Sequence, residues 1–156
     1  MNLFQTKAYI IVFFFFITVQ LNAQTWLWAN SIYVSTNVYA TGSIHISGIG
    51  TDRDKNVYIA GNFSGQMYIG NKVVLTSTPT GNDYDVGWDI FLAKFDTDGN
   101  LLWTFKAGKI LVDDVLGLAV DLDGNSYITG DFYNSSITFG NITLTETYYG
   151  TMFLAK

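Results

Sequence analysis

The chain has 156 residues, a net charge of −5 at pH 7 and no cysteine. Phosphate-bearing partners bind clustered Lys and Arg, and the chain has only 8 of these against 13 Asp and Glu, so we expect neither nucleic acid nor an anionic membrane surface as its partner. The missing cysteines exclude disulfides, thiol catalysis and thiolate metal sites, whereas 17% aromatic residues with 15 Gly and a single Pro favour strands and tight turns over helices.

Residues 1–23 have the layout of a secretory signal peptide. Lys7 supplies the positive charge, and the run from Ala8 to Val19 is uncharged but too short to cross a bilayer as a helix. Ala23 marks the expected cleavage point, and an uncleaved membrane anchor is the alternative. We therefore expect a secreted or cell-surface protein that has no membrane insertion after signal cleavage.

The rest of the chain contains an internal repeat. Ile49–Phe63 aligns without gaps on Leu118–Phe132, and the tetrapeptide FLAK at Phe91–Lys94 returns at Phe153–Lys156. Self-similarity at a fixed period is the sequence signature of repeat architectures. The sequence therefore predicts two copies of one structural unit.

Each unit is expected to contain four short strands joined by tight turns. In the first copy a longer excursion, Tyr68–Thr76, separates the second strand from the third, and the Asp-Gly pair at Asp98 and Gly99 predicts a hairpin before the fourth. Consecutive hairpins give an antiparallel meander. The four expected strands, rich in β-branched and aromatic residues, are Ile49–Asp52, Val57–Phe63, Asp89–Phe95 and Leu101–Lys106.

Several of these strands are apolar on both faces, which indicates sheets that are covered on both sides. A β-propeller blade is covered in this way by its two neighbours, and we prefer it to the alternatives, a β-sandwich or a β-solenoid. The predicted fold class is all-β, with antiparallel four-stranded meander repeats forming about two blades of a partial β-propeller. The predicted division is a signal peptide (1–23), an N-terminal strand and linker (24–48), propeller repeat 1 (49–107) and an incomplete propeller repeat 2 (117–156).

The repeat resembles the SBBP-type β-propeller repeat of secreted proteins of the Bacteroidota type. The resemblance rests on DLDGNSYITGDF at Asp121–Phe132, TFG at Thr138–Gly140 and DIFLAKFDTDGNLLW at Asp89–Trp103. The first copy departs from the pattern at Lys55, where the family prefers Gly. The resemblance implies an exported scaffold and no shared catalytic residues.

Acidic turns suggest a possible calcium site. Calcium takes six to eight oxygen ligands, and alternating Asp and Asn in a Gly-containing loop can supply several of them. The alternative, which we prefer, is a hairpin turn in which Asp and Asn bond to their own backbone. A third acidic turn runs from Asp52 to Asp54, and the candidate calcium ligands in the other two turns are Asp96, Asp98, Asn100, Asp121, Asp123 and Asn125.

No catalytic constellation is recognisable, and we predict that the chain is not an enzyme and needs no cofactor. His45 is the single histidine, and no Ser and Asp are recognisably arranged around it. A possible ligand loop carries Tyr84, Asp85 and Trp88, because polar and aromatic residues on a loop are typical of sugar or protein contacts. The alternative is a solvated insertion with Trp88 folded back onto the blade.

The function predicted from these features is a secreted, non-enzymatic propeller module for binding or structural roles at the cell surface, with an unknown protein or glycan as partner. The alternative is the propeller portion of a larger secreted hydrolase or adhesin whose active part lies beyond Lys156. We expect the chain to be a fragment of a longer protein whose exposed apolar blade face promotes association. Because Trp28 matches Trp103, we expect Thr25–Asn30 to act as the fourth strand of the last blade, and otherwise to pair at an edge or be poorly ordered.

Overall fold

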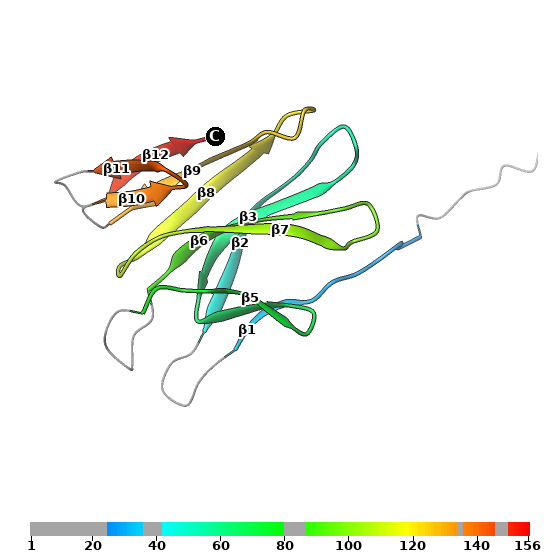
Figure 1. Ribbon diagram of the computed structural model, residues 1–156, viewed down its shortest axis with the longest axis horizontal. Helices are drawn as coiled ribbons and strands as arrows, with labels where there is room; N and C mark the ends of the chain where they lie inside the picture. Colours follow the sequence, from blue (N-terminus) through cyan, green and yellow to red (C-terminus); the bar gives the residue numbers. More distant parts are fainter. Residues whose placement is uncertain (1–24, 36–41, 80–86, 134–135, 146–149) are drawn as a thin grey trace, which may run out of the picture.

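The computed structural model describes residues 25–35, 42–79, 87–133, 136–145 and 150–156 (Figure 1). The expected signal peptide lies outside these residues. The described residues form strands and turns and contain no helix, so the predicted all-β class is confirmed. In this part of the chain no helix is present that could span a membrane.

The first unit is a four-stranded antiparallel sheet in the predicted meander order. It contains β2 (Ser43–Thr51), β3 (Val57–Ser64), β6 (Asp89–Phe95) and β7 (Leu101–Ala107), with spatial order β2-β3-β6-β7. The strand β2 begins earlier than the expected Ile49 and contains a bulge between Ile46 and Gly48. The early part of β2 was not predicted because glycine is uncommon in strands. Packing nevertheless requires glycine at position 48, because a Cβ on Gly48 would lie 2.7 Å from the Cβ of Leu118.

The second unit repeats three of these strands. It contains β8 (Asp113–Val120), β9 (Ser126–Phe132) and β12 (Thr151–Ala155), in the order β12-β9-β8. The register repeats as well, since Gly61 lies opposite Phe91 in the first unit and Gly130 lies opposite Phe153 in the second. The second unit also has the bulge, here between Val115 and Gly117. The strands β8, β9 and β12 therefore correspond to β2, β3 and β6.

The longer segment between the second and third strands forms a separate hairpin in each unit. It is formed by β4 (Gln66–Ile69) with β5 (Lys72–Thr76), and by β10 (Ser136–Phe139) with β11 (Ile142–Thr145). Both hairpins turn at a glycine with a φ of 60°, Gly70 and Gly140, a conformation that costs other residues energy.

The N-terminal strand is β1 (Ile32–Ser35), which pairs with β4 and not with a blade sheet. The preceding segment, residues 25–31, is described and is not a strand. The expectation that Thr25–Asn30 forms the fourth strand of the last blade concerns a blade that the described residues do not contain, and it stays a prediction. Side chains of residues 25–31 hold this segment against the β6–β7 turn: the Trp28 Nε1–H donates to the Thr97 carbonyl at 3.0 Å, and the Asn30 amide donates to the Gly99 carbonyl at 2.6 Å.

Both faces of the first sheet are buried, as its two-sided apolar strands predicted. On one face, Phe63 and Phe91 pack under β1, β4 and β5. On the other, Ile90 and Leu92 pack against the second unit, including Phe132. Together with the antiparallel meanders, this two-sided burial is the arrangement of partial propeller blades.

Candidate functional site

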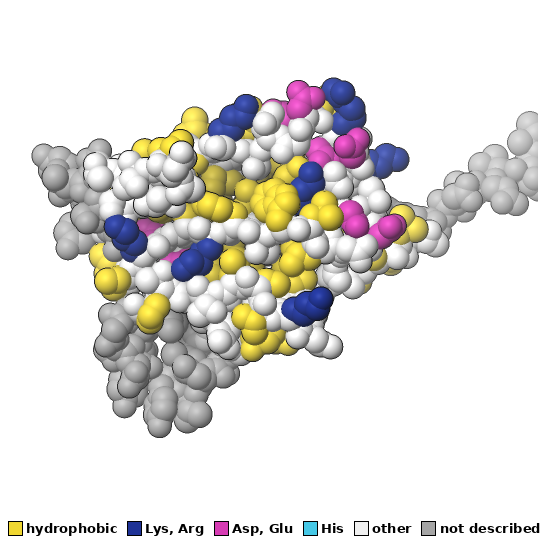
Figure 2. Space-filling view, viewed as in Figure 1, with side chains coloured by type: hydrophobic (Ala, Val, Ile, Leu, Met, Phe, Trp, Pro, Cys, Tyr) yellow, Lys and Arg dark blue, Asp and Glu magenta, His cyan; other side chains and the backbone are white. Residues whose placement is uncertain are grey.

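The three acidic turns lie at one end of the molecule, where Figure 2 shows most of the acidic side chains. In the β8–β9 turn, the Asp121 Oδ1 accepts the Asn125 backbone N–H at 2.9 Å, and its Oδ2 accepts the Asn125 side-chain amide at 2.7 Å. Asp96 and Asn100 repeat this arrangement between β6 and β7. The hydrogen bonds from Asn125 and Asn100 lower the pKa values of the Asp121 and Asp96 carboxyl groups. The first Asp of each turn, Asp121 or Asp96, therefore stabilises that turn through its own hydrogen bonds.

The remaining candidate calcium ligands are Asp98 and Asp123. Asp123 makes an exposed ion pair with Arg53 at 3.5 Å, and in the β6–β7 turn the Asp98 backbone N–H donates to Asp96. Among the residues that the structure describes, no group of three or more His, Asp or Glu side chains could hold a metal ion. The turn geometry accounts for the Asp and Asn pattern through hydrogen bonds within each turn.

The first acidic turn also joins the two units. The Arg53 backbone N–H donates to the Leu122 carbonyl at 3.1 Å, and the Tyr58 hydroxyl donates to the Gly124 carbonyl at 3.1 Å. Asp52 is buried beneath this contact and pairs with Lys94 at 3.1 Å. Hydrogen bonds, first from Asn56 and then from Lys94 and Tyr58, hold the pKa of the Asp52 carboxyl far below its usual range. This turn is consequently a structural joint between the blades.

A second polar cluster lies where the inner strands of the two units meet. The side chains of His45, Asn62 and Asp114 line a cavity of about 360 Å³ there. The Asn62 amide donates to Asp114 Oδ1, and its oxygen accepts the Val115 N–H at 2.9 Å. Burial, followed by the nearby charge of Asp131, raises the pKa of the Asp114 carboxyl, whereas Asn62 and His45 oppose the shift.

Sequence reasoning identified only His45 in this cluster. The signal was present in the repeat, because Asn62 and Asp131 occupy equivalent positions on β3 and β9, and His45 and Asp114 occupy equivalent positions on β2 and β8. Their proximity depends on how the two sheets pack together. A hydrogen-bonded amide beside a pair of carboxyl groups is chemically suited to fixing the contact between blades.

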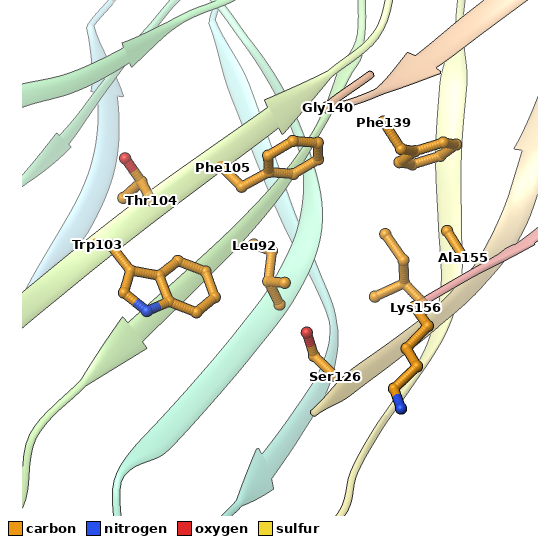
Figure 3. Close-up of a pocket in the computed structure, with 10 residues that line it drawn as sticks. Leu92, Trp103, Thr104, Phe105, Ser126, Phe139, Gly140, Ala155 and Lys156 are labelled. Carbon is orange, nitrogen blue, oxygen red and sulfur yellow. The ribbon is translucent and has the colours of Figure 1, made fainter. Parts of the chain in front are cut away.

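A hollow of about 480 Å³ opens between β7 of the first unit and the second unit (Figure 3). Figure 3 shows Trp103 and Phe105 on one side of it and Phe139 on the other, with Lys156 at its edge. Phe105 stacks on Phe139 with ring centroids 6.3 Å apart, and the Lys156 ammonium lies 5.3 Å from the centroid of the Tyr127 ring. An aromatic hollow with a cation at its rim fits a bulky apolar group next to an acidic one.

The predicted ligand loop falls mainly outside the described residues, which include neither Tyr84 nor Asp85. Trp88 is described and half-buried. It forms a parallel bridge with Val112, and its carbonyl accepts the Asp113 backbone N–H at 3.0 Å. Trp88 is therefore packed where the first unit meets the second.

Comparison with known proteins gives a relative that contains WD repeats. The chain matches no protein-family model. Over 55 residues, 35% of its length, it is 34% identical to an uncharacterized WD repeat-containing protein of Acanthamoeba polyphaga mimivirus. The matched stretch spans only 4% of that viral protein. This likeness and the antiparallel blade-like sheets together fit a β-propeller-type repeat protein.

Proposed function

We propose that the chain is a secreted, non-enzymatic β-propeller repeat module of the SBBP type that binds another protein at the cell surface. The layout of residues 1–23 supports export, and the sequence motifs of both units support the SBBP type. A protein partner is consistent with the WD repeat likeness, since WD repeat proteins typically bind other proteins.

The observation that carries the proposal is the aromatic hollow between the blades. Trp103 is partly exposed there although it also contacts Tyr58 edge to face, with ring centroids 6.0 Å apart. Protein interfaces concentrate their binding energy in aromatic residues around well-packed pockets. The hollow is carried by paired strands, which hold Trp103 and Phe105 in place before a partner arrives. A partner's apolar side chain, flanked by an acidic residue that faces Lys156, would fit it.

The internal use of the acidic groups supports a binding role over catalysis. The Asp96 and Asp121 carboxylates accept hydrogen bonds within their own turns, and the buried Asp89 pairs with Lys106 at 2.7 Å. These groups stabilise turns and strand ends.

The experiment is peptide selection against the immobilised chain, using a phage-displayed random library, with a glycan array run in parallel. We expect selected peptides to contain a bulky apolar residue near an acidic one and to bind in calorimetry. Trp103→Ala should reduce their affinity at least tenfold, whereas Leu102→Ala, an exposed neighbour outside the hollow, should not. Peptides that bind Trp103→Ala as well as the unchanged chain, or binding to glycans alone, would contradict the proposal. Export is tested by finding the protein outside the cytoplasm with Gln24 as its first residue.

A further inference from the structure

The second unit exposes the face that the first unit buries. In the first unit, Ile90 and Leu92 on β6 are 0% and 6% exposed because the second unit covers them. Their equivalents on β12, Met152 and Leu154, are 72% and 76% exposed. We call this surface of the second unit, which also includes Asp131, the front face. It has the same strand and register positions as an established interface within the chain.

The first unit exposes the complementary surface. Val115 and Leu118 on β8 are the side chains that the second unit packs against the first, and Val115 is only 2% exposed. Their equivalents on β2, Ile46 and Ile49, are 45% and 70% exposed. We call this surface of the first unit the back face; His45 lies on the same strand and also lines the cavity between the two units. The chain thus carries both halves of the same interface on its two outer sides.

Two equivalent glycines, Gly48 and Gly117, differ in the same way: among the described residues, the first has a neighbour from the other unit and the second does not. Gly48 leaves room for Leu118, whose Cβ lies 2.7 Å from the position that a Gly48 Cβ would occupy. Around the equivalent Gly117, the nearest described neighbour of such a Cβ is Thr129 Cγ2, at 3.4 Å and from the same unit. The space beside Gly117 is shaped to accommodate Ile49 of another copy, because Ile49 is the equivalent of Leu118.

The polar residues on the two faces are also complementary. Inside the chain, Asn62 of the first unit bonds to Asp114 and to the Val115 N–H of the second. The equivalent contact between two copies joins Asp131 to His45, an acid to a base.

We propose that copies of this chain assemble head to tail, with the front face of the second unit of one copy binding the back face of the first unit of the next. Such a heterologous contact gives a closed ring when its rotation closes.

The assembly would also complete the open edge of β12. In the described residues β12 pairs only with β9, whereas its equivalent β6 pairs with both β3 and β7. Open strand edges favour this kind of addition.

The first test blocks one face at a time and measures mass by light scattering after size exclusion. The unchanged chain should form a multimer of defined mass, and Leu154→Asp and Ile49→Asp should each be monomeric. Mixing the two variants should give a dimer and nothing larger, because only one intact front face meets one intact back face. Ile142→Asp is the matched control, since the equivalent position in the first unit is the lysine Lys72, and it should assemble normally. A monomeric unchanged chain at about 100 µM, or no dimer in the mixture, overturns the proposal.

The second test exchanges the polar pair. His45→Asp should abolish the multimer because it places two carboxylates together across the interface. Adding Asp131→Asn should restore the multimer, because it installs between copies the Asn and Asp pair that joins the units within the chain. Circular dichroism confirms that each variant is folded. Failure of the second substitution to restore assembly, or assembly of His45→Asp itself, would show that these two faces do not meet.

Discussion

Asn62 on β3 and Asp114 on β8 join the two blades through side chains that come from different units. The Asn62 amide donates to Asp114 Oδ1 and accepts the Val115 N–H at 2.9 Å, so one amide satisfies two groups of the neighbouring blade. Asn62 is almost fully buried. This contact fixes how the inner strands of the two sheets lie against each other.

Replacing Asn62 with Ala should destabilise the chain by about 2 kcal/mol, because it leaves the Val115 N–H and the Asp114 carboxyl without their partner in a buried place. Urea unfolding followed by circular dichroism measures the change. Asn71→Ala, at an exposed hairpin turn, is the matched control and should change the free energy of unfolding by less than about 0.5 kcal/mol. Equal effects of the two substitutions would show that the bond between blades contributes little.

Asp114→Asn should stabilise the folded chain at neutral pH. Burial and the charge of Asp131 raise the pKa of the Asp114 carboxyl in the folded state, so its contribution is fully present below the unfolded pKa and is lost as pH rises through the folded pKa. The substitution removes that loss and keeps an oxygen for Asn62. Urea midpoints from pH 3 to pH 8 should therefore separate with increasing pH and converge at the acidic end. Parallel midpoints across the range would contradict this assignment.

Calcium should change the melting temperature little, because the Asp96 and Asp121 carboxylates already accept hydrogen bonds within their turns. Ligand-linked stabilisation requires a site that is occupied well above its dissociation constant. The measurement is a thermal melt with and without millimolar calcium. An increase of several degrees that is lost when Asp121→Ala is combined with Asp123→Ala would establish a calcium site in the β8–β9 turn.

Gly61→Ala should destabilise the first blade by about 3 kcal/mol, because its Cβ would lie 1.9 Å from the His45 carbonyl oxygen and backbone atoms cannot move aside cheaply. Gly117→Ala, whose Cβ would meet only an ordinary contact at 3.4 Å within the chain, is the control and should fold normally when both variants are measured as dilute monomers. Chemical unfolding of both variants provides the comparison. Equal stability of the two would mean that β2 can shift relative to β3.

The repeated local signals allowed the blades to be predicted from the sequence. The Asp-Gly and Asp-Asn turns specify hairpins through their own backbone bonds, and the strands Val57–Ser64 and Asp89–Phe95 are apolar enough to be recognised without their neighbours. Burial of both sheet faces followed from the same pattern. These properties depend on interactions over a few residues, which a sequence displays directly.

The tertiary structure alone decided the positions that depend on a distant partner. Trp28 resembles Trp103 in sequence, yet its indole N–H donates to the carbonyl of Thr97, and a strand forms at Ile32–Ser35. Likewise, His45 reads as an isolated histidine along the chain, and only packing of β8 against the first sheet brings it beside Asp114. The sequence by itself determined the turns, the strands and their repetition, because short-range bonding dictates them. The blade interface and its polar cluster were decided by contacts between residues more than fifty positions apart, whose geometry exists only after the sheets have packed.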